Sequence, residues 1–226
     1  MTGSASEPRP LVILGAGGFA REVRWLLGDL HGGSRYRFAG YAVSDLSRLG
    51  PHDSRGDVVG DFDWLATHRD RFSALAFGIG NPGVKDRIAK QLDELLPDAE
   101  WPSLIHASVR IDHGSAVIGR GVVVCAGVLG TVAITLDELA MVNLGCTLGH
   151  ESRVGRCGVL NPTVNISGGV DLGERVLVGT GAQVLQYVTI GNDATIGAGA
   201  VVTKDVPPGA TVVGIPAKPV VQSGTK

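Results

Sequence analysis

The residues best suited to chemistry are two neighbours, His150 and Glu151, in the stretch VNLGCTLGHESRVG. Because histidine changes its protonation state near neutral pH, it is the side chain best matched to removing a proton from an amine or a hydroxyl. A carboxylate beside it can accept a hydrogen bond from Nδ1, which fixes the tautomer in which Nε2 faces the acceptor. The pair predicts a general base with a carboxylate partner. The competing interpretation is a histidine that is only exposed or lies in a subunit interface.

A six-residue repeat surrounds this pair. Counting in sixes from Ile118 to Val202, fourteen of the fifteen residues are aliphatic and Gly130 is the exception. Such a repeat predicts an all-β hexapeptide parallel β-helix, a prism with three hexapeptides in each 18-residue coil and the aliphatic residues inside. Five coils fit over Ile118–Pro207. An earlier stretch, Ile105–Ile111, joins this register through a one-residue slip near Asp112–Val117.

The register assigns an orientation to the histidine. His150 is at the third position of its hexapeptide, which points outward, so the register argues against a buried core histidine. Successive residues of a strand face opposite sides, so contact between His150 and Glu151 requires a chain corner, which Gly149 permits. One coil later, Gly168 places a backbone N–H beside the imidazole. That N–H can stabilise the oxyanion of a tetrahedral intermediate, unless the glycine serves only the turn.

The first part of the chain has a different period. Short apolar runs predict strands at 11–14, 37–43 and 74–80, and helical patterns predict helices at 19–30, 61–70 and 82–96. This alternation predicts an α/β domain, a small parallel sheet flanked by helices that equals about half of a Rossmann fold. The turn Gly15-Ala16-Gly17-Gly18, between a strand and a helix, presents backbone N–H groups suited to a phosphate. Residues 1–10 are expected to be a disordered leader.

Composition narrows the class of protein. The formal net charge of −2 argues against a nucleic-acid or anionic-membrane partner. Cys125, Cys146 and Cys157 have no C-x-x-C spacing, which argues against a disulfide framework or a structural zinc site and favours a reducing compartment. Since no run reaches the ~18 apolar residues of a membrane helix, we expect a cytoplasmic protein without membrane insertion.

The end of the chain, GAGAVVTKDVPPGATVVGIPAKPV, together with LVILGAGGFAREV near its start, resembles the sialic-acid O-acyltransferase-like family of left-handed β-helix acyltransferases. This family includes bacterial N-acetyltransferases that act on nucleotide-linked amino sugars. The resemblance implies a left-handed prism, against the usual right-handed crossover. It also implies acetyl-CoA as the co-substrate, no metal, and a homotrimer with active sites between subunits. The expected domains are a nucleotide-sugar-binding domain at 11–104, an acyltransferase domain at 105–220 and a tail at 221–226.

The same resemblance assigns roles on the prism. His150 is the base, Glu151 its partner and Asn143 a cleft residue, and Asn161 follows Asn143 one coil later, so that the two amides stack. A solvated surface lysine is the simpler interpretation of each candidate phosphate partner taken alone. The residues expected to bind acetyl-CoA are two backbone positions along the pantetheine, Thr180 and Ala198, and two phosphate partners, Lys204 and Lys218.

For the nucleotide sugar, the resemblance points to the glycine turn and to the later loop GIGN, Gly78–Asn81. Similar enzymes often carry an acidic pair at the end of the second strand, whereas this chain has Val43 and Ser44 there and Asp45 one place late. The nucleotide base is therefore left without an assigned partner. An NAD-binding domain is the other interpretation of the turn, but only half of a doubly wound sheet fits before residue 105. The candidate residues are Gly15, Gly17, Gly18, Asp45, Gly80 and Asn81.

The leading hypothesis is an acetyl-CoA-dependent N-acetyltransferase acting on the amino group of a nucleotide-linked amino sugar. A sugar O-acetyltransferase of the sialic-acid type would use the same base. A metal-dependent carbonic anhydrase on the same prism needs three convergent histidines, and only His106, His113 and His150 lie near the prism. A non-catalytic nucleotide-sugar-binding or assembly protein remains, and it is favoured if replacing His150 changes only affinity.

Overall fold

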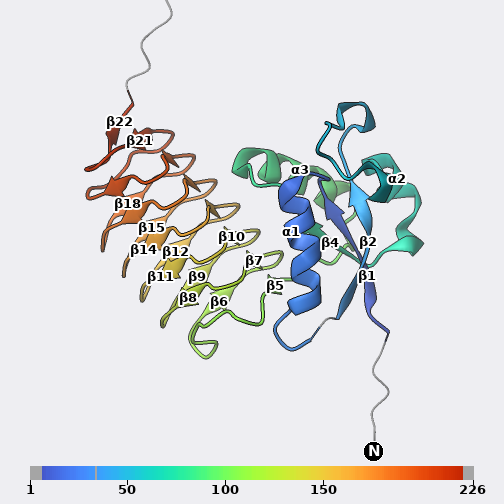
Figure 1. Ribbon diagram of the computed structural model, residues 1–226, viewed down its shortest axis with the longest axis horizontal. Coiled ribbons are helices and arrows are strands. Elements are labelled where there is room, and N and C mark those ends of the chain that lie inside the picture. The colour runs from blue at the N-terminus through green and yellow to red at the C-terminus, as the bar shows by residue number, and fades with distance from the viewer. Residues whose placement is uncertain (1–6, 34, 221–226) are drawn as a thin grey trace, which may run out of the picture.

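The structure is a computed structural model that describes residues 7–33 and 35–220. It has two units, a sheet with helices and a stack of short strands (Figure 1). Most of the predicted leader and all of the predicted tail at 221–226 lie outside the described residues. The leader predicted at 1–10 is too long, because Arg9 and Pro10 extend strand β1, Arg9–Leu14, along its parallel partner. None of the helices within the described ranges is both long and apolar enough to span a membrane.

The N-terminal sheet is parallel and has the strand order β3-β2-β1-β4. Strand β3 escapes prediction because its three residues are too few to show a period of two. The predicted strands and helices are present with shifted ends, and the half-Rossmann assignment stays a prediction. The elements after β1 are β2 Tyr36–Ala42, β3 Val58–Gly60, β4 Ala74–Phe77, α1 Gly18–Leu26, α2 Phe62–Thr67, α3 Pro82–Leu95, and the 3₁₀ helices η1 Leu27–Asp29, η2 Leu46–Arg48, η3 Arg55–Asp57 and η4 Arg69–Arg71.

Alternate residues of β1 face opposite sides of this sheet. Leu11 and Ile13 pack in the apolar cluster that contains the buried face of α1, whereas Val12 and Leu14 pack in the cluster that contains the buried face of α3. All four side chains are completely buried. Helices α1 and α3 therefore cover opposite faces, as the continuous apolar strand requires.

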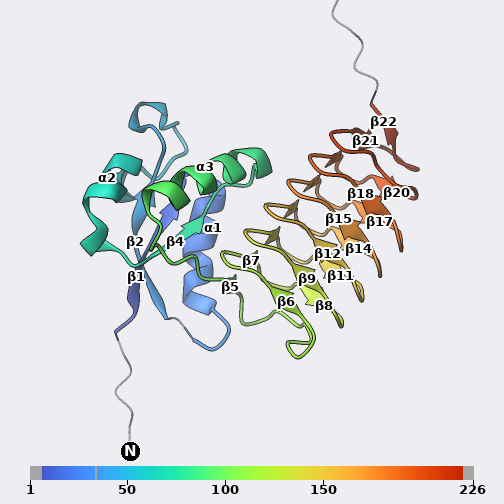
Figure 2. The same ribbon diagram turned by 180° about the vertical axis from the view of Figure 1, so that it is seen from behind.

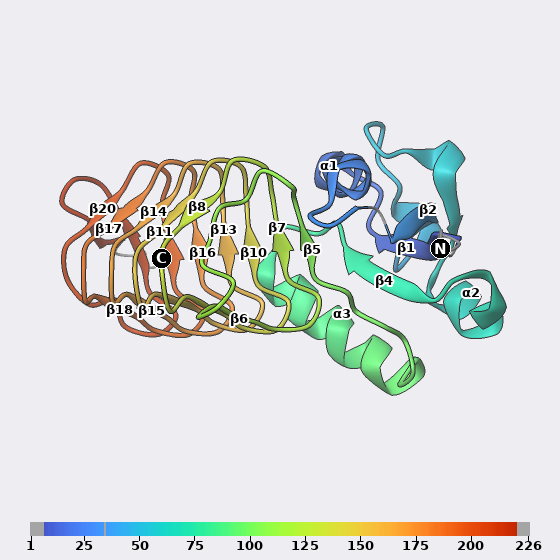
Figure 3. The same cartoon turned by 90° about the horizontal axis from the view of Figure 1, so that it is seen from below.

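The C-terminal unit is a prism of very short strands in three sheets, seen from behind in Figure 2 and from below in Figure 3. All pairs are parallel except β21 with β22. The strands are β5 Leu104–Ile105, β6 Val117–Ile118, β7 Val123–Val124, β8 Leu129–Gly130, β9 Thr135–Leu136, β10 Met141–Val142, β11 Thr147–Leu148, β12 Arg153–Val154, β13 Val159–Leu160, β14 Asn165–Ile166, β15 Asp171–Leu172, β16 Leu177–Val178, β17 Gln183–Val184, β18 Thr189–Ile190, β19 Thr195–Ile196, β20 Val201–Val202, β21 Thr211–Val213 and β22 Lys218–Pro219.

The strand register confirms the six-residue repeat. From β6 to β20, paired residues lie 18 positions apart, as Val117 and Thr135 do, and the predicted aliphatic residues fill the interior. Before β6 the spacing is 19, since Leu104 pairs with Val123. This confirms the one-residue slip. Because Leu104 already belongs to a prism sheet, the prism begins one residue before the predicted boundary.

The prism has three corners, each a column of three-residue segments repeated once per coil. The third residue of a corner segment has positive φ in four or five successive coils of each column, including 59° at Glu151 and 64° at Gly169. We call the corners by what marks them: the helix corner (119–121, 137–139, 155–157, 173–175, 191–193), the asparagine corner (125–127, 143–145, 161–163, 179–181, 197–199) and the histidine corner (131–133, 149–151, 167–169, 185–187, 203–205).

The two units share their apolar core. Met141 of β10 and Val159 of β13 belong to the cluster with α1, and Leu139 and Cys157 of the helix corner belong to the cluster with α3. A core common to both units limits their relative motion, because separating them would expose apolar surface to water. The N-terminal unit is therefore held against the first coils of the prism.

The three cysteines lie inside this structure as buried, unbonded thiols. Burial raises the pKa of Cys125 to about 12 and that of Cys146 to about 11, and it also raises the pKa of Cys157. Since the thiolate is the reactive form, burial keeps these side chains unreactive at neutral pH.

Candidate active site

The histidine corner brings His150 and Glu151 together. His150 Nδ1 lies 3.2 Å from Glu151 Oε2, and the two side chains are 52% and 67% exposed. Consecutive side chains meet here because Glu151 adopts the left-handed backbone conformation that turns the chain at each corner. His150 therefore points outward, as the repeat predicts, with a carboxylate beside one ring nitrogen.

Gly168 lies directly against the imidazole on the next coil. A Cβ built on Gly168 would be 2.3 Å from His150 Nε2, so only glycine leaves room for the ring. Within residues 7–33 and 35–220, the Gly168 N–H donates no backbone hydrogen bond, whereas the following N–H of Gly169 binds the His150 carbonyl at 2.8 Å. The corner thus combines a proton acceptor, its carboxylate partner and an N–H group that can bind an oxyanion.

The asparagine corner holds a second group of candidates. Asn143 is 6% exposed, and its Oδ1 accepts a hydrogen bond from the Leu144 N–H at 2.8 Å. Asn161 follows one coil later and donates from Nδ2 to the Val178 carbonyl at 3.1 Å. Thr180 and Ala198 belong to later coils of the same corner. The sheet β20-β17-β14-β11-β8 lies between this corner and the histidine corner, so one chain does not bring these residues to His150.

Lys204 and Lys218 line one cavity of about 290 Å³ at the far end of the prism, together with Thr203, Asp205 and Pro216. Lys204 also belongs to the histidine corner, three 18-residue coils beyond His150. The structure thus brings together the two lysines that the sequence offers as phosphate partners, one from the last coil and one from β22.

The glycine turn has the predicted position between β1 and α1. Gly15 has φ of 100°, and a Cβ there would be 3.1 Å from the Gly78 carbonyl oxygen, which explains the glycine. Gly17 is the N-cap of α1, which begins at Gly18. The loop at 49–57 folds over this turn, since the Ser54 N–H donates to the Ala16 carbonyl at 3.0 Å.

Sequence reasoning missed two charged residues at this turn. The Asp53 carboxylate approaches Gly17, where a Cβ would lie 3.5 Å from Oδ1, and its Oδ2 accepts the Gly50 N–H at 2.7 Å. Arg21 donates to the His52 carbonyl at 2.6 Å. A phosphate at the turn would therefore meet one carboxylate and one guanidinium. The polar run HDSRGD was the available signal, but its distance from the turn in sequence hid the contact.

Asp45 lines a cavity of about 180 Å³ with Gly15, Asp53, Phe62 and Ile79. Its carboxylate caps η2, accepting from the Ser47 hydroxyl at 2.6 Å and the Ser47 N–H at 2.9 Å. These hydrogen bonds, the hydroxyl first, lower the pKa of Asp45. Asp45 is thus an ionised acceptor at the edge of a mostly apolar cavity.

The loop Gly78–Asn81 joins β4 to α3. Asn81 Oδ1 accepts from the Val84 N–H at 2.9 Å and caps the helix. A Cβ on Gly80 would be 3.9 Å from Met141 Cε, so the loop runs against β10 of the prism. The loop therefore lies at the junction of the two units.

The three histidines near the prism have different partners. His106 Nδ1 lies 2.8 Å from the Ser108 hydroxyl, His113 stacks on His31 with ring centroids 5.1 Å apart, and His150 contacts Glu151. Across the part of the chain that the structure describes, no group of three or more His, Cys, Asp or Glu side chains is arranged to hold a metal. The three-histidine site that a prism carbonic anhydrase requires is therefore not assembled by these residues within one chain.

Known proteins match this arrangement. A family model described as bacterial transferase hexapeptide (six repeats) matches residues 169–204. A histidine-to-asparagine mutant of perosamine N-acetyltransferase from Caulobacter crescentus, in complex with CoA and GDP-perosamine, has a TM-score of 0.83 and 31% sequence identity, covering 93% of this chain and 96% of that one. The acetyltransferase domain of PglB from Neisseria gonorrhoeae has a TM-score of 0.81 and 30% identity, covering 94% and 100%. That domain is also known in complex with acetyl coenzyme A, with the same TM-score and identity.

Curated relatives match a smaller part. The serine acetyltransferase of Mycobacterium tuberculosis is 40% identical over 121 residues, 54% of this chain and 44% of that protein. The chain spans about half the length of the curated relatives it matches. The solved structures, in contrast, are matched at 30% identity or more over nearly their whole length, with both units of this chain included. The chain therefore belongs to the hexapeptide-repeat acyltransferase family, and its prism is a left-handed β-helix.

Proposed function

We propose that the chain transfers the acetyl group of acetyl-CoA to the amino group of a nucleotide-linked amino sugar, with His150 as the general base. The observation that carries the proposal is the histidine corner, where His150, Glu151 and Gly168 meet. The similarity to an N-acetyltransferase bound to CoA and GDP-perosamine extends over 93% of the chain, so it includes the N-terminal unit as well as the prism.

The histidine corner supplies each group that acyl transfer needs. His150 Nε2 takes a proton from the sugar amine as its nitrogen attacks the thioester carbonyl carbon. Glu151 accepts the Nδ1–H hydrogen bond and keeps the ring in the required tautomer. The Gly168 N–H binds the oxyanion of the tetrahedral intermediate. The intermediate then breaks its C–S bond, and the departing thiolate of CoA receives the proton from His150.

We place acetyl-CoA in a groove between two subunits of a homotrimer. Within one chain, a sheet separates the asparagine corner from the histidine corner. Residues of the asparagine corner, namely Asn143, Thr180 and Ala198, can therefore reach a thioester at His150 only from a neighbouring subunit. Lys204 lies three coils from His150, about 14 Å at the usual strand spacing. That separation suits a thioester at one end and the phosphates of CoA at the other, where Lys218 joins Lys204.

The nucleotide sugar is placed between the glycine turn and the loop Gly78–Asn81. Its diphosphate would take the N–H groups at the start of α1 and the guanidinium of Arg21, with Asp53 restricting the approach. The small cavity beside Asp45 suits a nucleobase, since it is mostly apolar with a carboxylate acceptor at its edge. Because Gly80 has no side chain, the loop leaves space between this region and β10.

Transfer to a hydroxyl is the second candidate. The 40% identity to a protein named serine acetyltransferase favours it, because serine offers a hydroxyl group as the acetyl acceptor. The same base would deprotonate a hydroxyl as well as an amine. The two candidates therefore differ only in the acceptor, which the N-terminal unit selects in the first and does not in the second.

The testing experiment measures thiol release from acetyl-CoA by the purified protein. The acceptors are UDP-, GDP- and dTDP-linked 3-amino and 4-amino sugars, with L-serine, free sialic acid and CMP-sialic acid beside them. The variants are His150→Ala and, as a matched control, His113→Ala, whose imidazole stacks on His31 away from the site. Light scattering of the same samples measures the oligomeric state.

Release with a nucleotide-linked amino sugar that His150→Ala lowers by about 10²-fold or more, with His113→Ala unaffected, supports the proposal. Release only with serine or sialic acid moves the assignment to O-acetylation. If no acceptor gives release, or if His150→Ala equals the wild type, the proposed reaction and base are wrong. If the protein is a monomer in solution, the proposed binding of acetyl-CoA between two subunits is wrong.

A further inference from the structure

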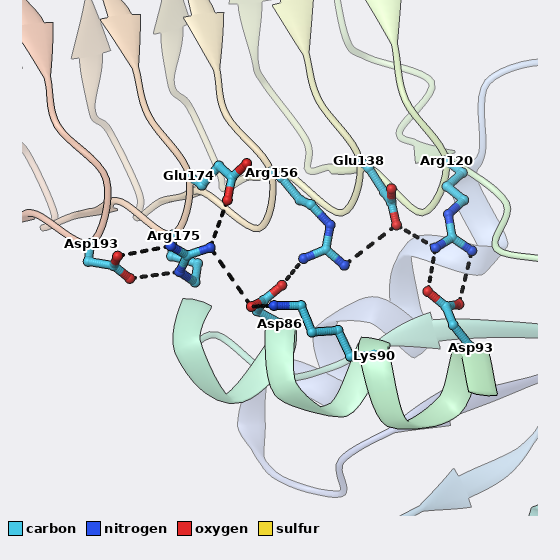
Figure 4. A network of polar contacts seen from close by, with 9 residues as sticks. All are labelled: Asp86, Lys90, Asp93, Arg120, Glu138, Arg156, Glu174, Arg175 and Asp193. Atoms are coloured by element: carbon cyan, nitrogen blue, oxygen red, sulfur yellow. Dashed lines mark hydrogen bonds and ion pairs between the residues drawn. The ribbon is translucent and has the colours of Figure 1, made fainter. Parts of the chain in front are cut away.

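Helix α3 lies along the helix corner of the prism, and a chain of ion pairs joins the two (Figure 4). The helix contributes Asp86, Lys90 and Asp93. Asp86 is 7% exposed, an unusual burial for a carboxylate, which requires cationic partners close by. The other members of the network are Arg120, Glu138, Arg156, Glu174, Arg175 and Asp193 from the prism.

The prism supplies these charges in an alternating column. Positions 120, 138, 156 and 174, one coil apart, are Arg, Glu, Arg and Glu. Along the column, Arg120 contacts Glu138 at 2.5 Å and Arg156 approaches Glu138 at 3.7 Å. Each cation of the column therefore has a carboxylate one coil away.

Each end of α3 meets a cation of this column. Asp93 accepts two hydrogen bonds from Arg120, at 3.1 and 2.6 Å. Asp86 forms an ion pair with Arg156, lies 3.8 Å from Arg175 and contacts Lys90 at 2.9 Å. The N-terminal part of the helix thus faces later coils than its C-terminal part does.

The spacing of these contacts matches helix and prism geometry. Seven residues of α-helix span about 10.5 Å, and two coils span about 9.6 Å, so Asp86 and Asp93 meet two arginines of the column at once. One helical turn, about 5.4 Å, is close to one coil. A slip of α3 by one coil toward Arg120 would place Asp86 opposite Glu138, and a slip by one coil the other way would place Asp93 opposite Glu138, so that like charges meet in either case. The alternation therefore penalises the nearest wrong registers.

The register of α3 sets the place of the loop before it. Asn81 ends the loop Gly78–Asn81 and caps α3, so loop and helix start move together. Gly80 in that loop runs against Met141 of β10. A slip of one coil would move the loop by about 4.8 Å along the prism, and a misplacement of about 1 Å can cost an enzyme ~10²-fold in rate.

We infer that Asp86 and Asp93 are positioning residues: their pairs with Arg156 and Arg120 fix the register of α3 on the prism and thereby hold the loop Gly78–Asn81 at the acceptor site. The inference rests on the proposed function for the identity of the acceptor. The register itself does not depend on that identity. Neither carboxylate touches the reacting atoms.

The test compares Asp86→Asn and Asp93→Asn with Asp193→Asn. Asp193 is the matched control because it loses a bidentate pair with Arg175 at the same corner, at 2.7 and 2.9 Å, yet among the described residues it forms no hydrogen bond or ion pair with α3. Two quantities are measured on the full chain: hydrogen exchange of the Gly78–Asn81 amides, and KM and kcat with the amino-sugar acceptor and with acetyl-CoA. Asp86→Glu, which restores the charge, tests rescue. If Asp86→Asn, at the more buried site, does not fold, Asp93→Asn still tests the inference.

The expected result is faster exchange in the loop and a fall of about 10-fold or more in kcat/KM for the acceptor in the two α3 variants, with KM for acetyl-CoA within about 2-fold. Asp193→Asn should change neither quantity. Unchanged exchange in both α3 variants, or an equal effect in Asp193→Asn, overturns the inference. If the wild type accepts no amino sugar, the proposed function fails, and loop exchange alone then decides the inference.

Discussion

The histidine corner and the helix corner are built by the same coil, with the same left-handed backbone at their third residues. Their charged side chains nevertheless have different environments. At the histidine corner, His150 and Glu151 are half exposed and contact each other. At the helix corner, hydrogen bonds to Asp93 raise the pKa of Arg120, and hydrogen bonds to Asp193 raise that of Arg175. The repeat thus provides equivalent positions, and what packs over a corner decides whether its charged side chains stay exposed or pair with a neighbouring element.

The largest expected effect is a loss of catalytic activity, which distinguishes the histidine corner from the helix corner. His150→Ala should lower kcat by about 10²–10⁴-fold, because it removes the general base, and should leave the melting temperature nearly unchanged, because the side chain is half exposed. Steady-state kinetics and thermal melting measure the two quantities. A loss of stability comparable to that of a helix-corner variant would erase the proposed difference between corners.

Gly168→Ala tests how tightly the histidine corner is built. The added methyl would collide with His150 Nε2, so the ring must move, and kcat should fall by about 10²-fold. Gly28→Ala is the control, since nothing lies within 4 Å of a Cβ there and the residue lies outside the proposed binding sites. Activity in Gly168→Ala equal to that of the control would mean that the contact between glycine and imidazole has no catalytic consequence.

Arg156→Ala tests whether the ion pairs of the helix corner stabilise the folded protein. It leaves the buried Asp86 without its nearest cation, and we expect a loss on the order of 2–3 kcal/mol in the free energy of unfolding. Arg153→Ala is the control three residues away, because Arg153 pairs with Asp137 and Asp171 at the surface, where a loss of about 1 kcal/mol or less is expected. Urea unfolding measures both. Equal losses of unfolding free energy in the two variants would show that the contact with α3 adds no stability to the ion pairs of the helix corner.

Lys85 of α3 gives an effect on stability that depends on pH. This side chain of α3 is 2% exposed, and burial lowers its pKa to about 8. Below pH 8 the folded protein carries the buried charge, a penalty of about 3 kcal/mol. Between pH 8 and the ordinary lysine value of 10.5 the folded state loses its proton first, so stability rises with pH.

Lys85→Met should therefore be more stable than the wild type at pH 7, and the difference should shrink as pH rises toward 10. Unfolding in urea at pH 7, 8.5 and 10 measures it, and taking the difference between the two proteins cancels other titrating groups. A variant that is less stable at pH 7 would mean that the lysine charge is needed within the helix-corner network.

The prism and its catalytic candidates were accessible from the sequence because a strict repeat converts sequence distance into position. Eighteen residues equal one coil, so Gly168 was expected beside His150 and is found there. The N-terminal unit has no such rule. Strand β3 was missed, and the contact of Asp53 with the glycine turn follows from a loop that folds back over 36 residues.

The sequence by itself determined the hexapeptide prism, its 18-residue coil, the outward histidine and its acidic neighbour, because each follows from local periodicity and from the conformations that corner residues adopt. Only the tertiary structure decided that α3 covers one corner and leaves another open, that Lys204 and Lys218 share a cavity, and that Asp86 is buried among arginines. These are contacts between segments with no fixed spacing, and they form where apolar burial and charge pairing across the two units are satisfied together.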